Sequence, residues 1–467
     1  MSLKTPKAIR NLQRQLYSKA KAEPQFRFYQ LYDKIWRNDI LAHAWALSRA
    51  NRGAPGVDGV TFEQIEAEGL EHWLGGLQEE LRSQRYRPQA VRRVMIPKPG
   101  GGHRPLGLPT IKDRVVQTAA KLVLEPIFEA DMEDCAYGYR PKRSAIDAVK
   151  AVHGALLKGY TDVVDADLSK YFDTIPHQEL LGSLRLRIVD RAVLALLKSW
   201  LQAPVQSEGP QGLSITGGKK TKMGTPQGGV ISPLLANRYM NRYLRYWKQC
   251  TGDKRFAATL VNYADDFVIL SKGRADQALA WTTQVMNKLK LEVNETKTCV
   301  RNARIERLDF LGYSFGLHHV QRTGRPYLGA SASAKAVLRL KGKISAALRP
   351  QSGELEEVRD KLNRMLVGWE AYFHYGSKRK TYRALSAHAR TTVRNFLQRR
   401  HKVSSRGTHH FTHGKIFEEW GVHELGGQPT TPNADSGAMN QVGKSDAGNP
   451  RVRFDERGLE MGSRLPR

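Results

Sequence analysis

The stretch Tyr263-Ala264-Asp265-Asp266 lies between two short apolar runs, Ala258–Val261 and Phe267–Leu270. Both runs have the length of a buried strand, so we expect a β-hairpin that presents two adjacent carboxylates at its turn. An Asp-Asp pair in an ordinary polar turn is the alternative, and this dipeptide alone does not separate the two interpretations. The rest of the chain has to decide between them.

A third carboxylate is available in the strand-like run Val163–Leu168. Its alternation puts Asp165 and Asp167 on one face, and spacing alone does not choose between them. Three such carboxylates can hold two Mg²⁺ ions, or Mn²⁺ in their place. A pair of ions supports in-line displacement at phosphorus, which is the chemistry that this pattern favours.

The composition favours a nucleic-acid partner. The 467 residues suffice for roughly two to four domains, and 75 Lys and Arg against 45 Asp and Glu give a formal charge of +30. Such a balance suits a polyphosphate. No membrane anchor, span or signal peptide is visible, so we expect a cytoplasmic, nucleoid-associated protein without a membrane partner. Cys135, Cys250 and Cys299 are isolated, which favours oxygen-ligated metal chemistry.

The chain changes character along its length. Residues 1 to about 50 alternate basic and aromatic positions, most clearly at residues 27–37, in a helix-compatible pattern. This pattern indicates either a nucleic-acid-facing extension or a solvated amphipathic helix. A turn-rich Gly/Pro loop follows at residues 51–61. From Arg92 to about Gly316, short strands and helices alternate without a clean βαβ repeat, which predicts an α+β fold. Beyond Gly426 bulky apolar residues are scarce, and we expect a disordered tail.

After Ser331 the pattern becomes helical. Two apolar faces are predicted, one formed by Leu362, Leu366, Trp369 and Phe373, the other by Tyr382, Leu385, Ala389 and Phe396.

The second predicted helix also carries a basic face, and residues 377–402 contain no acidic residue. A solvated face of a bundle helix normally includes Glu or Asp at i,i+4, so their absence favours contact with a nucleic-acid backbone. The members of this basic face are Arg379, Arg383, Arg390 and Arg394.

Segments suited to a nucleotide accompany the carboxylates. Residues 93–107 are expected to form a strand, a glycine turn and a strand, with Lys98 and Arg104 placed to close over a triphosphate. The glycines of Gly224–Pro233 allow close backbone approach to a base pair and open onto a helix. Phe172, five residues after Asp167, would stack beneath a sugar and exclude a 2′-hydroxyl; core packing is its alternative role.

Taken in order, these segments resemble the group II intron reverse transcriptase and maturase family, and six or more motifs in one order are far more specific than any one. The resemblance covers about residues 50–425. It is carried by Gly53–Thr61, Ile96–Arg114, Tyr137–Pro141, Asp167–Asp173, Gly224–Pro233, Tyr263–Asp266, Leu291–Lys297, Leu308–Tyr313, Gly368–Phe373 and Phe411–Leu425.

The resemblance implies an α+β right-hand polymerase of fingers, palm and thumb, with a helical thumb or maturase domain and a short DNA-binding segment. We therefore expect five segments: an N-terminal extension and loop, fingers and palm, the thumb, the DNA-binding segment, and the tail. Their expected bounds are 1–60, 61–330, 331–402, 403–425 and 426–467.

The resemblance also implies roles for single residues. It selects Asp167 over Asp165, so that Asp167, Asp265 and Asp266 would be the catalytic Mg²⁺ ligands. The nucleotide would be held by Lys98 and Arg104 at its triphosphate, by Phe172 at its sugar, and by Pro226 and Gln227 at the nascent pair, with Lys297 protonating the departing pyrophosphate.

The function implied is that of an RNA-directed DNA polymerase that also binds its intron RNA to assist splicing and retrohoming. Its partners would be the intron RNA, an RNA template with a DNA primer, and target DNA. Many relatives end in an endonuclease domain with Cys/His pairs, and this chain shows none, so we expect an existing 3′ end or an RNA-made nick to serve as primer. A domesticated enzyme of DNA repair or defence and a splicing-only maturase are the alternatives.

Overall fold

The computed structural model describes residues 3–97, 101–209, 212–251, 256–320, 322–349 and 353–427. Lys98 and the expected tail beyond Gly427 lie outside these ranges. By packing, the chain divides into one unit of residues up to Arg143, Ala166–Val268 and Asp276–Cys299, and a second of Ser144–Asp165, Ile269–Ala275 and the residues from Val300 onward. The segment bounds expected from the sequence stay predictions.

None of the helices in the described ranges is long and apolar enough to cross a membrane.

Helices dominate the N-terminal part of the first unit. They are α1 (Lys7–Ala22), α2 (Tyr32–Ile35), α3 (Asn38–Asn51) and α4 (Phe62–Arg82). The helix-compatible pattern expected over residues 1 to about 50 is therefore largely confirmed, but it is wrong for residues 23–31, which form no helix. Phe28 is buried, and its backbone is hydrogen-bonded to Arg187 and Val189. Long-range pairing has overridden the local pattern here.

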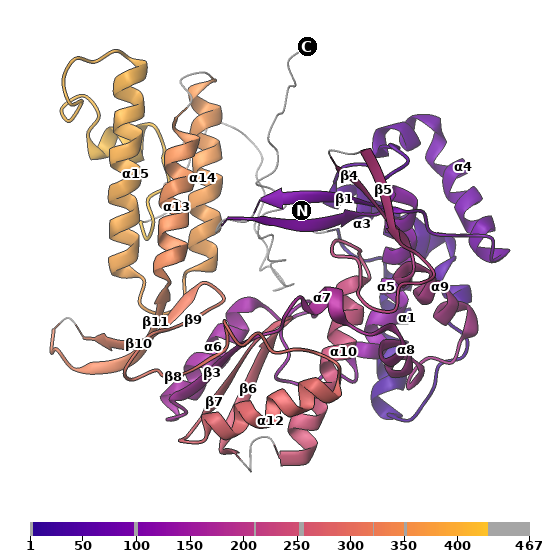
Figure 1. Ribbon diagram of the computed structural model, residues 1–467. Coiled ribbons are helices and arrows are strands. Elements are labelled where there is room, and N and C mark those ends of the chain that lie inside the picture. Colours follow the sequence, from indigo (N-terminus) through magenta and orange to yellow (C-terminus); the bar gives the residue numbers. More distant parts are fainter. Residues whose placement is uncertain are drawn as a thin grey trace. The chain divides into compact units, whose positions relative to one another are not determined.

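A four-stranded sheet follows in the same unit. Its strands are β1 (Val91–Pro97), β2 (His103–Leu108), β4 (Pro204–Gly209) and β5 (Gly212–Gly217), in the order β2-β1-β4-β5. β1 and β2 are antiparallel, from Arg92 opposite Leu108 to Pro97 opposite His103. The expected pair of strands is therefore confirmed, and Figure 1 shows them as two long strands side by side. The turn between them includes residues outside the described ranges.

Three helices accompany this sheet, namely α5 (Ile111–Glu129), α8 (His177–Arg185) and α9 (Arg191–Leu201). The long helix α5 begins where the Thr110 side chain accepts a hydrogen bond from the backbone N–H of Asp113, which satisfies a donor that has no partner within the helix. Helix α5 is buried on several sides, as the buried side chains of Val115, Val116 and Val123 show.

A second sheet carries the carboxylates. Its strands are β3 (Asp162–Asp167), β6 (Ala258–Tyr263), β7 (Asp266–Ser271) and β8 (Cys299–Asn302), in the order β6-β7-β3-β8. The expected hairpin is confirmed, because β6 and β7 are neighbours joined by two residues. Phe267 to Leu270 are wholly buried, as an uninterrupted apolar run predicts. The helices that follow or precede these strands are α6 (Ala145–Leu157), α7 (Tyr171–Thr174), α10 (Ser232–Tyr246) and α12 (Ala275–Lys288), with a π-helical turn at Trp247–Thr251.

The C-terminal part of the second unit begins with a three-stranded antiparallel sheet and ends in helices. The strands are β9 (Leu308–Phe310), β10 (Tyr313–His319) and β11 (Pro326–Ala332), in the order β11-β10-β9. The helices are α13 (Ala334–Ala347), α14 (Leu355–Tyr372) and α15 (Arg379–Arg400), which Figure 1 shows alongside one another, and a π-helical turn at Lys415–Glu419.

The core of this helical bundle confirms both predicted apolar faces. Leu362 and Leu366 of α14 are fully buried, and Trp369 packs against the same cluster. Tyr382, Leu385, Ala389 and Phe396 of α15 are buried there too. The residues after α15 complete this core with Ile416, Phe417, Val422 and Leu425.

Candidate active site

The Asp265-Asp266 turn is shaped by its neighbours. Ala264 has a left-handed backbone with φ of 59°, and the hairpin packs on the segment of Gly138. A Cβ added to Gly138 would lie 2.5 Å from the backbone nitrogen of Ala264, closer than any side chain allows. Glycine at position 138 therefore allows the backbone of the hairpin that carries the carboxylates to lie close to this motif.

Asp167 is brought to the same place by strand order. It is the last residue of β3, which is the neighbour of β7, and its carbonyl accepts a hydrogen bond of 2.8 Å from the N–H of Asn294. Asp165 and Asp167 are both half-buried while Val164 and Ala166 are buried, so the predicted alternation is confirmed.

Lys297 is the cation among these carboxylates. Its Nζ lies 2.6 Å from Oδ2 of Asp167. The hydrogen bond with Asp167 raises the pKa of Lys297, and the charges of Asp167, Asp266 and Asp265 raise that pKa further. All three aspartates thus act on one ammonium group. Burial raises the pKa of Asp265, and the nearby charge of Asp167 adds to this rise while Arg104 and Lys297 oppose it.

These residues fit divalent cations by charge and by ligand chemistry. Carboxylate oxygens are the ligands that Mg²⁺ prefers, and the ammonium of Lys297 stands where positive charge is needed to offset them. In the described residues, no three His, Cys, Asp or Glu side chains are grouped as ligands of one ion. Lys297 is itself largely exposed, so its side chain has room to leave.

The nucleotide-binding candidates form a chain of hydrogen bonds beside the carboxylates. Nε of Arg104, on β2, donates to Oε1 of Gln227 at 3.1 Å. Nε2 of Gln227 in turn donates to Oδ2 of Asp173 at 3.0 Å. The structure thus brings Arg104 and Gln227 together, as the sequence leads one to expect, and adds Asp173, a residue that sequence reasoning missed.

The loop containing Pro226 and Gln227 lies against the edge of β2. The N–H of Gly107 donates to the carbonyl of Gln227, and a Cβ on Gly228 would lie 2.3 Å from the carbonyl oxygen of Gly107. Gly228 also has a positive φ of 104°. Two independent constraints therefore demand glycine where the loop meets the strand.

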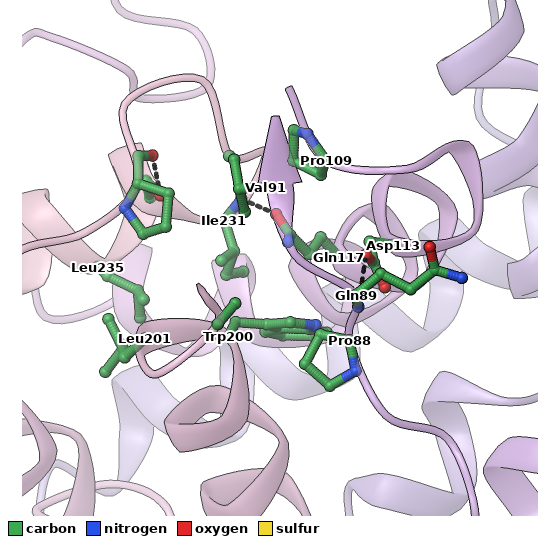
Figure 2. Close-up of a pocket in the computed structure, with 14 residues that line it drawn as sticks. Pro88, Gln89, Val91, Pro109, Asp113, Gln117, Trp200, Leu201, Ile231 and Leu235 are labelled. Carbon is green, nitrogen blue, oxygen red and sulfur yellow. Dashed lines mark hydrogen bonds between the residues drawn. The ribbon is translucent and has the colours of Figure 1, made fainter. Parts of the chain in front are cut away.

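The same loop is supported from behind, where Figure 2 shows a pocket lined by residues of the first unit. Oε1 of Gln117 accepts a hydrogen bond from the N–H of Ile231, and the hydroxyl of Ser232 donates to the carbonyl of Pro226 at 2.8 Å. Trp200 and Leu235 supply apolar walls. Gln117 and Ser232, two of the polar residues that line the pocket, thus help to hold the loop.

Phe172 packs within an aromatic group. The side chain is 6% exposed, and its ring meets those of Tyr139 and Tyr171 edge-on at 6.4 Å and 5.7 Å between centroids. Its carbonyl accepts a hydrogen bond of 2.7 Å from the N–H of Thr225. Phe172 therefore lies directly beside the Gln227 loop, and both roles considered for it stay open to experiment.

The basic face of α15 is carried by the second unit. Arg379, Arg383 and Arg390 are exposed, whereas Arg394 is half-buried. Its Cγ would lie 3.7 Å from a Cβ at Gly407, so this residue is partly covered by the chain that follows α15. Three arginines of this face, at spacings of four and seven residues, are therefore exposed.

Gly138 and Asp173 are residues of the site to which the sequence analysis assigned no role. Both lie inside motifs that carried the resemblance, so their position gave a signal. What the sequence could not supply was their contacts, with Ala264 and with Gln227, across long stretches of chain.

Two family profiles match the chain. The one described as "Reverse transcriptase (RNA-dependent DNA polymerase)" covers residues 96–315, and the one described as "Group II intron, maturase-specific domain" covers residues 337–413. The fold is accordingly the right-hand fold of reverse transcriptases, with a maturase domain after the polymerase.

Similar proteins agree with these profiles. Protein YkfC of Escherichia coli (strain K12) is 35% identical over 342 residues, which are 65% of this chain and 87% of YkfC. The group II intron-encoded protein LtrA of Lactococcus lactis subsp. cremoris is 28% identical over 362 residues, so that the match covers 64% of this chain and 58% of LtrA. A solved telomerase from Candida albicans is 14% identical, with a TM-score of 0.41 over 75% of this chain and 67% of that one, a likeness too weak to support an argument.

The chain belongs to the group II intron reverse transcriptase and maturase family. The enzyme class expected from the sequence, a reverse transcriptase, is thereby confirmed.

Proposed function

We propose that this reverse transcriptase copies RNA with two Mg²⁺ ions held by Asp167, Asp265 and Asp266, and that it binds intron RNA to assist splicing and retrohoming. The observation that carries the catalytic part is the strand order β6-β7-β3, which puts the end of β3, at Asp167, in the strand next to the hairpin of Asp265 and Asp266. Neighbouring strands lie about 4.8 Å apart, a spacing at which their carboxylates could share cations.

The residues divide the work of nucleotide transfer. When bound, two ions would polarise the attacking primer hydroxyl and stabilise the departing pyrophosphate. Asp167, Asp265 and Asp266 would hold the two ions, and Arg104 would donate hydrogen bonds to the triphosphate. Pro226 and Gln227 line the nascent pair, Phe172 lies under the sugar, and Lys98 would join Arg104.

Lys297 has a role that depends on its contact with Asp167. An ammonium whose pKa is raised by a carboxylate holds its proton more firmly. In the arrangement seen, Lys297 balances the negative charge of the site before cations arrive. Released from Asp167, it would regain its ordinary acidity and become able to protonate pyrophosphate.

Intron RNA binding is supported by the maturase-specific match at residues 337–413 and by the exposed arginines of α15. That match spans most of α13 to α15, so the basic face belongs to the domain that defines the family. LtrA is described as encoded by a group II intron. Target DNA would be engaged through the same excess of positive charge, and an existing 3′ end would prime synthesis.

The test is the double variant Asp265→Asn with Asp266→Asn. Primer extension on an RNA template should fall below detection, because neutral amides cannot neutralise the cations. Binding of the same template should stay within about twofold, because affinity rests on Lys and Arg elsewhere. Asp276→Asn on α12 is the matched control, an acid outside the site. Undiminished extension by the double variant would refute the assignment, and a wild-type chain that promotes splicing without extending any primer would identify a splicing-only maturase.

A further inference from the structure

We propose that Asp173 is a positioning residue of the nucleotide site, which fixes the side-chain amide of Gln227 and, through it, the guanidinium of Arg104 before a nucleotide binds. This inference rests on the proposed function and deepens it. It concerns the order of the site in the absence of substrate, and therefore the affinity for the incoming nucleotide.

The polarity of the two hydrogen bonds leaves a single arrangement. A guanidinium can only donate, so the oxygen of the Gln227 amide must face Arg104, at 3.1 Å. A carboxylate can only accept, so the NH₂ of the same amide must face Asp173, at 3.0 Å. Both neighbours demand the same orientation. An amide that would otherwise turn freely is thus locked from its two ends.

The backbone holds the two ends of this relay together. The N–H of Thr225 donates to the carbonyl of Phe172 at 2.7 Å, and that of Gly224 donates to the carbonyl of Ile175 at 2.8 Å. Nε2 of His177 is the donor to the carbonyl of Gly224, at 2.7 Å, since a carbonyl can only accept. The segment of Asp173 and the loop leading to Gln227 therefore move as one.

The relay leaves Arg104 ready for a phosphate. Within the described part of the chain, its guanidinium makes the hydrogen bond through Nε to Gln227, so the two terminal nitrogens stay available for phosphate oxygens. Anchoring one end of the guanidinium reduces the rotamer freedom that binding would otherwise have to remove. Since Asp173 directly follows Phe172, the sugar and base contacts share one support.

The first test is Asp173→Ala, measured by steady-state incorporation of one deoxynucleotide on an RNA template. We expect KM for the nucleotide to rise about five- to tenfold, the size of one lost hydrogen bond in a solvent-exposed position, while kcat changes by less than about twofold. Asp173→Asn keeps an acceptor but no longer dictates the amide's orientation, and its KM should lie between the two. Thermal unfolding of each variant shows whether it is folded. A KM equal to that of wild type would overturn the proposal.

The second test exchanges the two polar groups. Gln227→Glu alone faces the carboxylate of Asp173 and should lose nucleotide affinity. Combined with Asp173→Asn, the new Glu accepts from Arg104 and from the NH₂ of the new Asn, so both hydrogen bonds re-form with their polarity kept at Arg104. We expect the pair to recover at least about fivefold in kcat/KM over Gln227→Glu alone. A merely structural role for Asp173 predicts instead that the two losses multiply.

The possible outcomes distinguish failure of the proposed function from failure of the positioning role of Asp173. A wild-type chain without primer extension would overturn the proposed function and this inference with it. Extension by the wild type, together with an exchange no better than Gln227→Glu alone, would overturn the inference and leave the function standing.

Discussion

The buried ring of Phe172 has two possible roles, core packing and selection of the nucleotide's sugar. The ring packs edge-on against Tyr139 and Tyr171, and the backbone of Phe172 binds the loop of Gln227, where we propose that the ring meets a sugar. We expect Phe172→Ala to lower the preference for deoxynucleotides over ribonucleotides by about ten- to a hundredfold, since a ring that occupies the space of a hydroxyl is removed. Competing single-nucleotide incorporation of dATP and ATP measures this preference. Phe172→Tyr, which keeps the ring, is the control, and unchanged preference in an active Phe172→Ala enzyme would leave core packing as its sole role.

Gly138 offers a second test at a single residue. In Gly138→Ala the new methyl group would meet the backbone nitrogen of Ala264 at 2.5 Å, and backbone cannot yield as a flexible side chain does. We expect the Asp265-Asp266 turn to shift, with primer extension reduced at least about tenfold and stability by about 1–3 kcal/mol. Gly154→Ala in α6 is the control, because nothing lies within 4 Å of its added Cβ. Wild-type activity in Gly138→Ala would show that the turn tolerates the displacement.

Among the elements, α15 joins a buried face to a charged one. Replacing the exposed Arg383 and Arg390 by Gln should weaken intron RNA binding about tenfold or more. The slope of log K against log salt should fall by roughly 1.4–1.8, because each lost phosphate contact removes about 0.7–0.9. Lys19 and Arg143, already ion-paired with Glu23 and Asp134, supply a control pair with the same change in net charge. An unchanged slope in the α15 variant would place the RNA elsewhere.

α14 allows the bundle core to be tested on a single helix. Leu366 is fully buried, whereas its neighbour Val367 is 49% exposed. Leu366→Ala should lower the free energy of unfolding by about 2–5 kcal/mol, through lost burial and the cavity left behind. Val367→Ala should change it by no more than about 0.5 kcal/mol. Urea denaturation followed by circular dichroism measures both, and equal effects would contradict the arrangement of the core.

Elements were predictable from sequence where their pattern is local. The β6–β7 hairpin follows from two short apolar runs, and the β1–β2 pair from strand-like segments around glycines. The apolar faces of α14 and α15 follow from a period of about 3.6 residues. Residues 23–31 were not predictable in this way, because Phe28 pairs with Arg187 and Val189, far away in sequence. For the same reason Asp173 was missed: its partner Gln227 lies 54 residues on, and no periodicity reports such a contact.

For the whole molecule, the formal charge of +30 sets a background of binding to any polyanion. Affinity for an unrelated RNA duplex should fall about 10³-fold or more between 50 mM and 200 mM salt, if six or more phosphates are contacted. If folded intron elements also form hydrogen bonds that salt does not screen, selectivity for intron RNA should rise over the same range. Filter binding of both RNAs at each salt concentration tests this, and parallel losses would mean that recognition is wholly electrostatic.

The apolar side chains after α15 determine which C-terminal truncations of the protein would keep its bundle core intact. Ile416, Phe417, Val422 and Leu425 fill the interior of the bundle made by α13, α14 and α15. A premature stop codon between positions 403 and 416 would therefore remove all four side chains. The apolar core of the bundle would then be exposed to solvent, so the shortened product should be degraded or aggregate. A stop codon placed after Gly427 would keep all four of these core side chains.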